Sequence, residues 1–233
     1  MIDELWSSEK LLEKGLEQLN LSLQTAPGNL RGTVLSLLQK YLEEIDLFNE
    51  AYGLVKVKDR RELIIKHIFD SLSPLSIITT LLANRPTVWQ IADVGSGAGF
   101  PGIPLAICLP SAQFTLIERM GRRSGFLRDC IAVLGITNVQ VDEKEMEKAA
   151  PGSYDTAVFR AFRPLEPVIL KGLLRLLKPG GFLAAWKGRF ENSREEMMAV
   201  EKSLPGLKWE ILPLVVPFLE EERHLTIIRH ETG

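Results

Sequence analysis

The sequence lacks the features that mark membrane, secreted and metal-binding proteins. It contains only two cysteines, Cys108 and Cys130, and three histidines in 233 residues. Neither cysteine belongs to a pair with metal-ligand spacing, so we expect reduced thiols and no metal site. No run of about 18 apolar residues occurs, and acids stand in the first ten residues, where a secretory signal would be basic. These absences predict a cytoplasmic protein with no membrane partner.

The chain also lacks an excess of positive charge. It carries 28 basic and 30 acidic residues, a net charge of −2. Proteins that bind nucleic acid usually carry a basic excess, because they neutralise phosphates. Any RNA-binding surface must therefore be local. The 45% hydrophobic and 25% charged shares are those of an ordinary globular protein, with length for one large domain and a smaller appendage.

The first part of the chain has a helical pattern. Apolar residues recur at steps of three and four between Leu30 and Phe48, and a second helical pattern covers residues 63–83. The polar stretch between them, residues 53–61, predicts an exposed loop. We expect residues 1–85 to form an N-terminal helical appendage and residues 86–233 to form the main domain.

Beyond residue 87, short apolar runs alternate with helical stretches, which predicts a parallel sheet with crossover helices. The predicted strands cover residues 88–94, 114–118, 139–142, 156–159 and 182–186, and the helices 103–109, 122–134 and 167–177. Two final strand-like runs, 209–216 and 224–229, are joined by a loop too short for a helix, so they should pair antiparallel. The predicted fold is α/β, a doubly wound, Rossmann-like seven-stranded sheet that ends in an antiparallel hairpin.

A glycine-rich turn, IADVGSGAGFPG at residues 91–102, is the strongest local motif. Glycine lets a ligand approach the backbone closely, which predicts a ligand at the carboxyl end of the first strand. Gly97, Gly99 and Gly102 also spell the dinucleotide pattern. Asp93 argues against a pyrophosphate, since like charges 4 Å apart repel by roughly 4 kcal/mol at an effective dielectric near 20. The same carboxylate would attract the ammonium and sulfonium charges of S-adenosylmethionine.

Glu118 ends the second predicted strand. An acid at this position accepts hydrogen bonds from the ribose hydroxyls of an adenosyl group. Nicotinamide cofactors require the same acid, so an oxidoreductase stays open at this point, as does a tight turn beside a surface acid. The closing hairpin is typical of methyltransferase sheets and favours methyl transfer.

Several further segments carry a family resemblance. They are 49–52 (NEAY), 67–72 (HIFDSL), 93–107, 126–128 (FLR), 160–162 (RAF), 187–188 (KG) and 222–225 (ERHL). The chain thereby resembles the bacterial 16S ribosomal RNA guanine-N7 methyltransferases, also called the glucose-inhibited division protein B family, over most of its length. This resemblance implies methyl transfer from S-adenosylmethionine to a guanine of 16S ribosomal RNA in the small ribosomal subunit. A methyltransferase of another RNA, a protein or a small molecule is the alternative, as is a non-catalytic RNA-binding module.

The resemblance also implies a set of cofactor-binding residues. They are Gly95 and Phe100 in the glycine turn, Met146 and Glu147 after the third strand, and Arg160 after the fourth. Glu118 joins this set from its position in the fold.

Methylation at N7 requires positioning and no catalytic base, because this nitrogen has a lone pair and no proton. We expect Arg160 and Lys187 to face phosphate, cofactor carboxylate or carbonyl oxygen. Phe162 is a candidate to stack on the base, with a core position as the alternative.

Four arginines without an intervening acid, Arg119, Arg122, Arg123 and Arg128, could contact RNA phosphates or form a solvated face. His67 and Asp70, three residues apart, are expected to form a structural hydrogen bond and not a catalytic pair.

Overall fold

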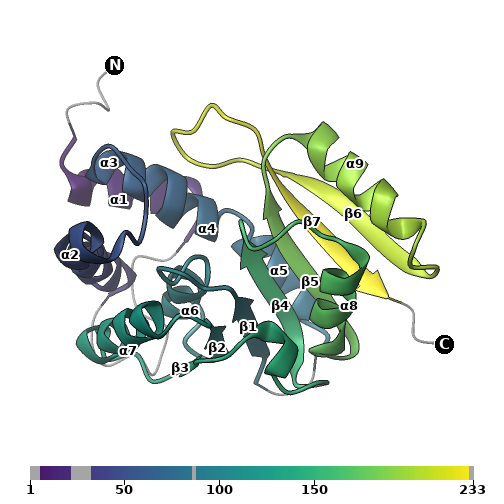
Figure 1. Ribbon diagram of the computed structural model, residues 1–233. Helices are drawn as coiled ribbons and strands as arrows, with labels where there is room; N and C mark the ends of the chain where they lie inside the picture. Colours follow the sequence, from purple (N-terminus) through teal and green to yellow (C-terminus); the bar gives the residue numbers. More distant parts are fainter. Residues whose placement is uncertain (1–5, 22–32, 86–87, 231–233) are drawn as a thin grey trace.

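The computed structural model describes residues 6–21, 33–85 and 88–230. One seven-stranded sheet, in the order β3-β2-β1-β4-β5-β7-β6, forms its centre (Figure 1). The strands are β1 (Gln90–Val94), β2 (Gln113–Ile117), β3 (Val139–Asp142), β4 (Tyr154–Arg160), β5 (Leu177–Lys187), β6 (Leu207–Leu214) and β7 (Arg223–His230). The first five strands are parallel, and β7 runs antiparallel to both β5 and β6. The predicted fold and its closing hairpin are confirmed.

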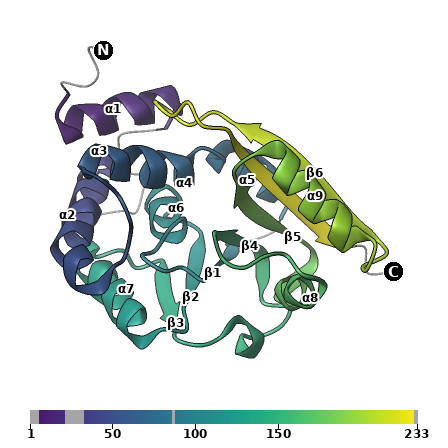
Figure 2. The same cartoon turned by 45° about the horizontal axis from the view of Figure 1, so that its top comes forward.

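Helices cover both faces of the sheet, as Figure 2 shows. They are α1 (Ser8–Gln18), α2 (Val34–Tyr52), α3 (Arg60–Leu63), the π-helix η2 (Ile64–Phe69), α4 (Asp70–Leu72), α5 (Leu75–Leu82), α6 (Gly102–Cys108), α7 (Gly121–Leu134), η3 (Met146–Lys148), α8 (Pro167–Arg175) and α9 (Phe190–Glu201). One hydrophobic cluster joins α1 to α7 with one face of the sheet, and a second joins α8 and α9 with the other face. The helices of the predicted appendage thus share a core with the sheet, while the predicted boundary at residue 86 lies outside the described residues.

Three elements differ from the sequence-based expectation. The helical stretch predicted for residues 63–83 is interrupted at Pro74, which cannot donate the backbone hydrogen bond of a helix interior. Strand β5 begins earlier than expected, at Leu177 instead of residue 182, and includes the Pro-Gly-Gly segment at residues 179–181. Helix α9 was not predicted, because only a few of its residues, including Met197 and Val200, are apolar and buried.

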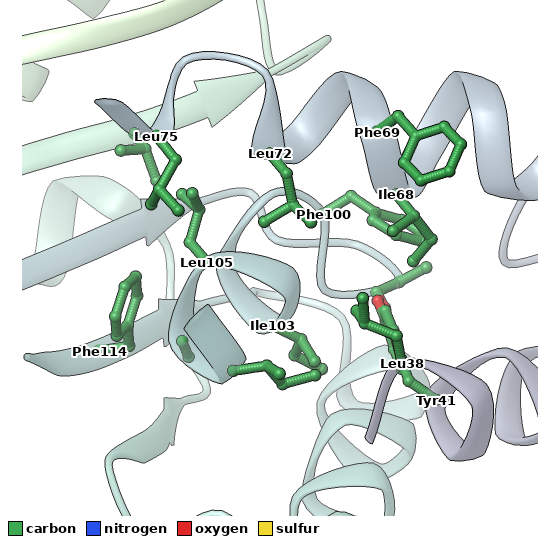
Figure 3. Close-up of a cluster of buried hydrophobic side chains, with 14 of the residues drawn as sticks. Leu38, Tyr41, Ile68, Phe69, Leu72, Leu75, Phe100, Ile103, Leu105 and Phe114 are labelled. Carbon is green, nitrogen blue, oxygen red and sulfur yellow. The ribbon is translucent and has the colours of Figure 1, made fainter. Parts of the chain in front are cut away.

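Helix α2 connects the N-terminal region to the glycine turn. The helix begins after Thr33, whose hydroxyl accepts a hydrogen bond from the Ser36 amide, and one apolar side of it is buried. Figure 3 shows Tyr41 of this helix reaching toward Phe100 and Ile103. The Tyr41 hydroxyl donates a 2.5 Å hydrogen bond to the carbonyl of Ala98, and its ring centroid lies 5.3 Å from that of Phe100. The turn is therefore anchored by a residue 57 positions earlier in the chain.

We expect Tyr41→Phe to lower the free energy of unfolding by about 1–3 kcal/mol, because the buried Ala98 carbonyl loses its side-chain donor. Urea unfolding measures this change. Tyr52→Phe on the same helix is the matched control: its ring lies beneath the Arg122 guanidinium and the substitution keeps that ring, so the change should stay within about 0.5 kcal/mol. Equal stabilities of the two variants would contradict the anchoring role.

Candidate functional site

The glycine turn crosses the carboxyl end of β1 and places backbone close to neighbouring side chains. Gly95 has φ +73°, a left-handed conformation that side chains rarely adopt. A Cβ built on Gly95 would lie only 2.4 Å from Cδ2 of Phe162. The Gly95 amide donates to the carbonyl of Ile117 on β2, at 2.8 Å. This position therefore requires glycine for both its conformation and its surroundings.

The carboxylate of Glu118 lies directly beneath this turn. One oxygen accepts a 2.9 Å hydrogen bond from the Gly97 amide, and the other accepts one of the same length from the Met120 amide. The side chain thus holds the glycine turn against the end of β2. Because each carboxylate oxygen has two lone pairs, both can still accept a hydrogen bond from a ligand hydroxyl.

A first cavity of about 210 Å³ opens beside these two residues. Its lining residues come from the ends of β1 and β2 and from the segments after β1, β2, β3 and β4: Val94, Gly95, Ile117, Glu118, Arg119, Met120, Arg123, Lys144, Glu145, Met146, Ala161, Phe162 and Arg163. An acid that can accept from ribose hydroxyls, a close backbone at Gly95, and thioethers at Met120 and Met146 that can pack against a ring fit an adenosyl group. The residues present therefore suit S-adenosylmethionine.

The predicted cofactor residues divide into two groups in the structure. Gly95, Glu118 and Met146 line the first cavity. Phe100 is buried under Tyr41 and the Arg160 guanidinium, and Glu147 accepts a 2.8 Å hydrogen bond from Arg163 outside the lining. Arg160 lines a different cavity.

That second cavity, of about 790 Å³, lies on the other side of the segment after β4. It is lined by Lys66, His67, Asp70, Phe159, Arg160, Ala161, Phe162, Arg163, Pro164, Trp186, Lys187, Gly188, Glu196 and Arg223. The three positioning candidates, Arg160, Phe162 and Lys187, all belong to this set. Residues 161–163 line both cavities and form the partition between them. Ala161 holds φ +48°, a left-handed conformation that costs a non-glycine residue roughly 1–2 kcal/mol.

Several lining residues were not predicted from the sequence. Met120 and Lys144 line the first cavity, and Trp186 and Glu196 line the second. The first two follow the carboxyl ends of β2 and β3, where ligands of doubly wound sheets bind, so their position was available as a signal. Glu196 lies on the unpredicted helix α9, and no local motif marks it.

Three acceptors hold the guanidinium of Arg160, two from the π-helix η2 and one from the residue that follows it. The guanidinium donates to the Lys66 carbonyl and the Asp70 carboxylate at 2.9 Å, and lies 2.7 Å from Nδ1 of His67. Burial and the neighbouring positive charge of Arg160 lower the pKa of His67 from 6.5 to about 3. His67 is therefore a neutral acceptor in this network. The Asp70 carboxylate also lies 3.3 Å from Nε of Arg223.

The structure places Asp93 away from both cavities. Its carboxyl is fully buried, and Oδ2 accepts a 2.9 Å hydrogen bond from the Gly102 amide. Burial raises the pKa of Asp93 to about 7. The expectation that this carboxylate faces ligand charges is therefore wrong; its observed contact is with the start of α6.

The four arginines after β2 have separate environments. Arg119 and Arg123 line the first cavity. The guanidinium of Arg122 lies 5.6 Å from the centroid of the Tyr52 ring, and Arg128 pairs with Glu143 at 2.8 Å.

Within residues 6–21, 33–85 and 88–230, no group of three acidic, histidine or cysteine side chains is arranged to hold a metal ion. None of the helices described is long and apolar enough to cross a membrane.

Known proteins resemble the chain over most of its length. A model of the family described as GidB, rRNA small subunit methyltransferase G, matches residues 34–226. The ribosomal RNA small subunit methyltransferase G of Treponema denticola is 38% identical, over 95% of this chain and 94% of that protein. The protein of the same name from Xanthomonas axonopodis is 36% identical, over 94% and 93%.

Solved structures share the fold at low sequence identity. A putative O-methyltransferase from Klebsiella pneumoniae matches with a TM-score of 0.59 at 17% identity, covering 100% of both chains. A SAM dependent methyltransferase from Aquifex aeolicus matches with a TM-score of 0.54 at 16% identity, covering 80% of this chain and 97% of that one. The methyltransferase type of sheet is thereby confirmed.

We expect the stability of the protein to fall below pH 6.5 through His67. The folded state keeps this ring neutral, whereas the unfolded chain takes up a proton, so the loss approaches about 1.4 kcal/mol per pH unit. Between pH 7 and pH 5, urea unfolding should show about 2 kcal/mol more loss for the wild type than for His67→Asn, which keeps an acceptor near Nδ1. His230→Asn, a change at an exposed histidine, should follow the wild type. A His67→Asn variant with the wild-type pH profile would contradict the neutral, buried role.

Proposed function

This chain belongs to the GidB family of rRNA small subunit methyltransferases, and we propose that it transfers a methyl group from S-adenosylmethionine to N7 of a guanine in 16S ribosomal RNA. Its partner in this proposal is the ribosomal RNA or the small ribosomal subunit that contains it, and its location is the cytoplasm. The observation that carries the proposal is the pair of adjacent cavities with a common partition at residues 161–163.

The two cavities have the properties that a methyl donor and its acceptor require. The first has the acid and the close backbone that suit an adenosyl ligand, supplied by Glu118 and Gly95. The second is larger, and cations and aromatic rings line it, which suits a nucleotide taken out of its stack. When bound, S-adenosylmethionine supplies a sulfonium methyl group. Methyl transfer needs donor and acceptor atoms about 3–3.5 Å apart, so the side chain of Phe162 in the partition controls their approach.

Each described acid or histidine that lines the second cavity already contacts a cation. The Nδ1 atom of His67 faces the Arg160 guanidinium, Asp70 pairs with Arg160, and Glu196 pairs with Lys187. This arrangement suits guanine N7, which can attack without losing a proton. In the proposed reaction these residues bind and orient the base and exclude water.

Paired cations also suit the charge that develops during transfer. Positive charge grows on guanine as N7 forms its bond, so an uncompensated cation nearby would oppose the reaction. The Lys187 ammonium and the Glu196 carboxylate are in contact at 2.5 Å, and Arg160 and Asp70 are in contact at 2.9 Å. The cations of the lining therefore offer hydrogen-bond donors while each of them contacts a carboxylate.

The decisive experiment incubates the protein with methyl-labelled S-adenosylmethionine and small ribosomal subunits from cells that lack this activity. Nuclease digestion and mass spectrometry then locate the label. We expect N7-methylguanosine at a single position of the 16S RNA. Label in another nucleoside, in ribosomal protein or in a small molecule would overturn the N7 proposal and favour the alternative methyltransferases.

Gly95→Ala should weaken the binding of S-adenosylhomocysteine about tenfold or more, because its Cβ would collide with Phe162 and displace the partition. Gly152→Ala is the control: this glycine also has a left-handed φ, of +62°, but nothing lies within 4 Å of its added Cβ. Both variants should lose roughly 1–2 kcal/mol of stability from backbone strain. Calorimetry measures the affinities, and unchanged affinity in a folded Gly95→Ala variant would remove Gly95 from the cofactor site.

A further inference from the structure

An aromatic side chain lies immediately beyond the lining of the second cavity. Strand β5 ends at Lys187, which lines the cavity together with Gly188. Helix α9 begins at Phe190, two residues after Gly188. Figure 1 shows this end of α9 at the same end of the sheet as the loop that joins β6 to β7. Arg189 and Phe190 therefore directly follow the cavity lining in sequence, and these two residues are here called the rim.

Phe190 contacts strand β7 and the loop that precedes it. The centroid of its ring lies 5.7 Å from that of the His224 ring, and Nδ1 of His224 lies 2.7 Å from the carbonyl of Gly188. The Phe190 amide donates to the Glu222 carboxylate at 3.4 Å. The ring position is thus tied to the same strand and loop that form the cavity wall.

Phe190 is nevertheless open to solvent. The residue is 39% exposed. Among the Phe, Tyr and Trp residues that the structure describes, it is the only exposed one. A single exposed apolar residue needs no functional explanation. Here, however, the ring lies beside a cavity whose proposed occupant is a nucleotide.

A cation accompanies this ring. Arg189 is exposed, and no ion pair joins it to any residue within the described ranges. By contrast, the cavity cations Lys66, Lys187 and Arg223 all contact carboxylates. The rim thus presents an exposed aromatic side chain with an exposed arginine at the preceding position. Proteins hold single-stranded RNA with this combination of residue types.

We propose that Phe190 and Arg189 form a second nucleotide subsite, which holds the RNA nucleotide adjacent to the target guanine. The neighbouring base stacks on the Phe190 ring, and Arg189 contacts the phosphate. This inference rests on the proposed function, because it places the target guanine in the second cavity. Every base has an aromatic face, so the subsite contributes affinity and not base identity.

The test uses small ribosomal subunits reconstituted with unmethylated, transcribed 16S RNA. Phe190→Ala should weaken subunit binding about tenfold or more, and Phe190→Leu should lose nearly as much, because it keeps apolar bulk without a flat ring. Phe190→Tyr should bind within about threefold of the wild type. The control is Met198→Ala, a change at a 44% exposed residue two turns further along α9, which should bind as the wild type does.

Two further measurements separate stacking from a structural role. The melting temperature and S-adenosylhomocysteine affinity of Phe190→Ala should stay at wild-type values; a loss of either with RNA affinity would show that the ring packs the fold. Arg189→Gln should reduce the slope of log affinity against log salt by about one. Replacing the bases that flank the target guanine should leave the Phe190→Ala effect unchanged.

The outcomes distinguish this inference from the function on which it rests. If the wild type methylates the subunit and Phe190→Ala binds the subunit as tightly as the wild type does, the subsite is overturned. The proposed function then stays intact. A wild-type protein that neither binds nor methylates the subunit overturns both.

Discussion

The buried ion pair between Asp70 and Arg160 is the interaction on which the arrangement of the site depends. The Asp70 side chain is 4% exposed, and its buried charge is compensated by the Arg160 guanidinium 2.9 Å away and by Nε of Arg223 at 3.3 Å. Asp70 begins α4, directly after the π-helix, whereas Arg160 ends β4. The Trp186 indole of β5 also donates to the Asp70 backbone carbonyl, at 2.8 Å. Removing Asp70 would take the carboxylate from Arg160, and removing Arg160 would leave the buried Asp70 to the more distant Arg223. The N-terminal helices and the sheet are therefore one structural unit at this point.

The π-helix explains how one short segment can hold Arg160 from three directions. A π-helical turn is wider than an α-helical turn and is used mostly as a local feature at functional positions. The carbonyl of Lys66 and the ring of His67 in η2, and the carboxylate of Asp70 directly after it, all reach the same guanidinium. The orientation of Arg160 fixes the end of β4, and the partition between the two cavities begins at the next residue.

The sequence was sufficient to predict the fold class, the glycine turn and part of the site, because these depend on local patterns. Periodicity located the five parallel strands and the closing hairpin, and Glu118 followed from its place at a strand end. The positions of Arg160 and Glu147 outside the first cavity were not predictable. They depend on ion pairs between residues distant in sequence, Arg160 with Asp70 and Glu147 with Arg163. Helix α9 was missed because its few buried residues give little apolar periodicity.

The small net charge of −2 has a counterpart in the second cavity, where the lining cations contact carboxylates. Glu221 is largely exposed, yet it contacts Lys66 at 3.0 Å and Arg223 at 2.9 Å, so two of the lining cations are already compensated. An RNA phosphate that approaches either cation must compete with this carboxylate, which reduces the electrostatic gain of binding. Affinity for RNA must then come largely from shape and from contacts with bases, and less from charge. A site of this kind discriminates against RNA that cannot present an unstacked base, and that discrimination suits the proposed methylation of a single guanine.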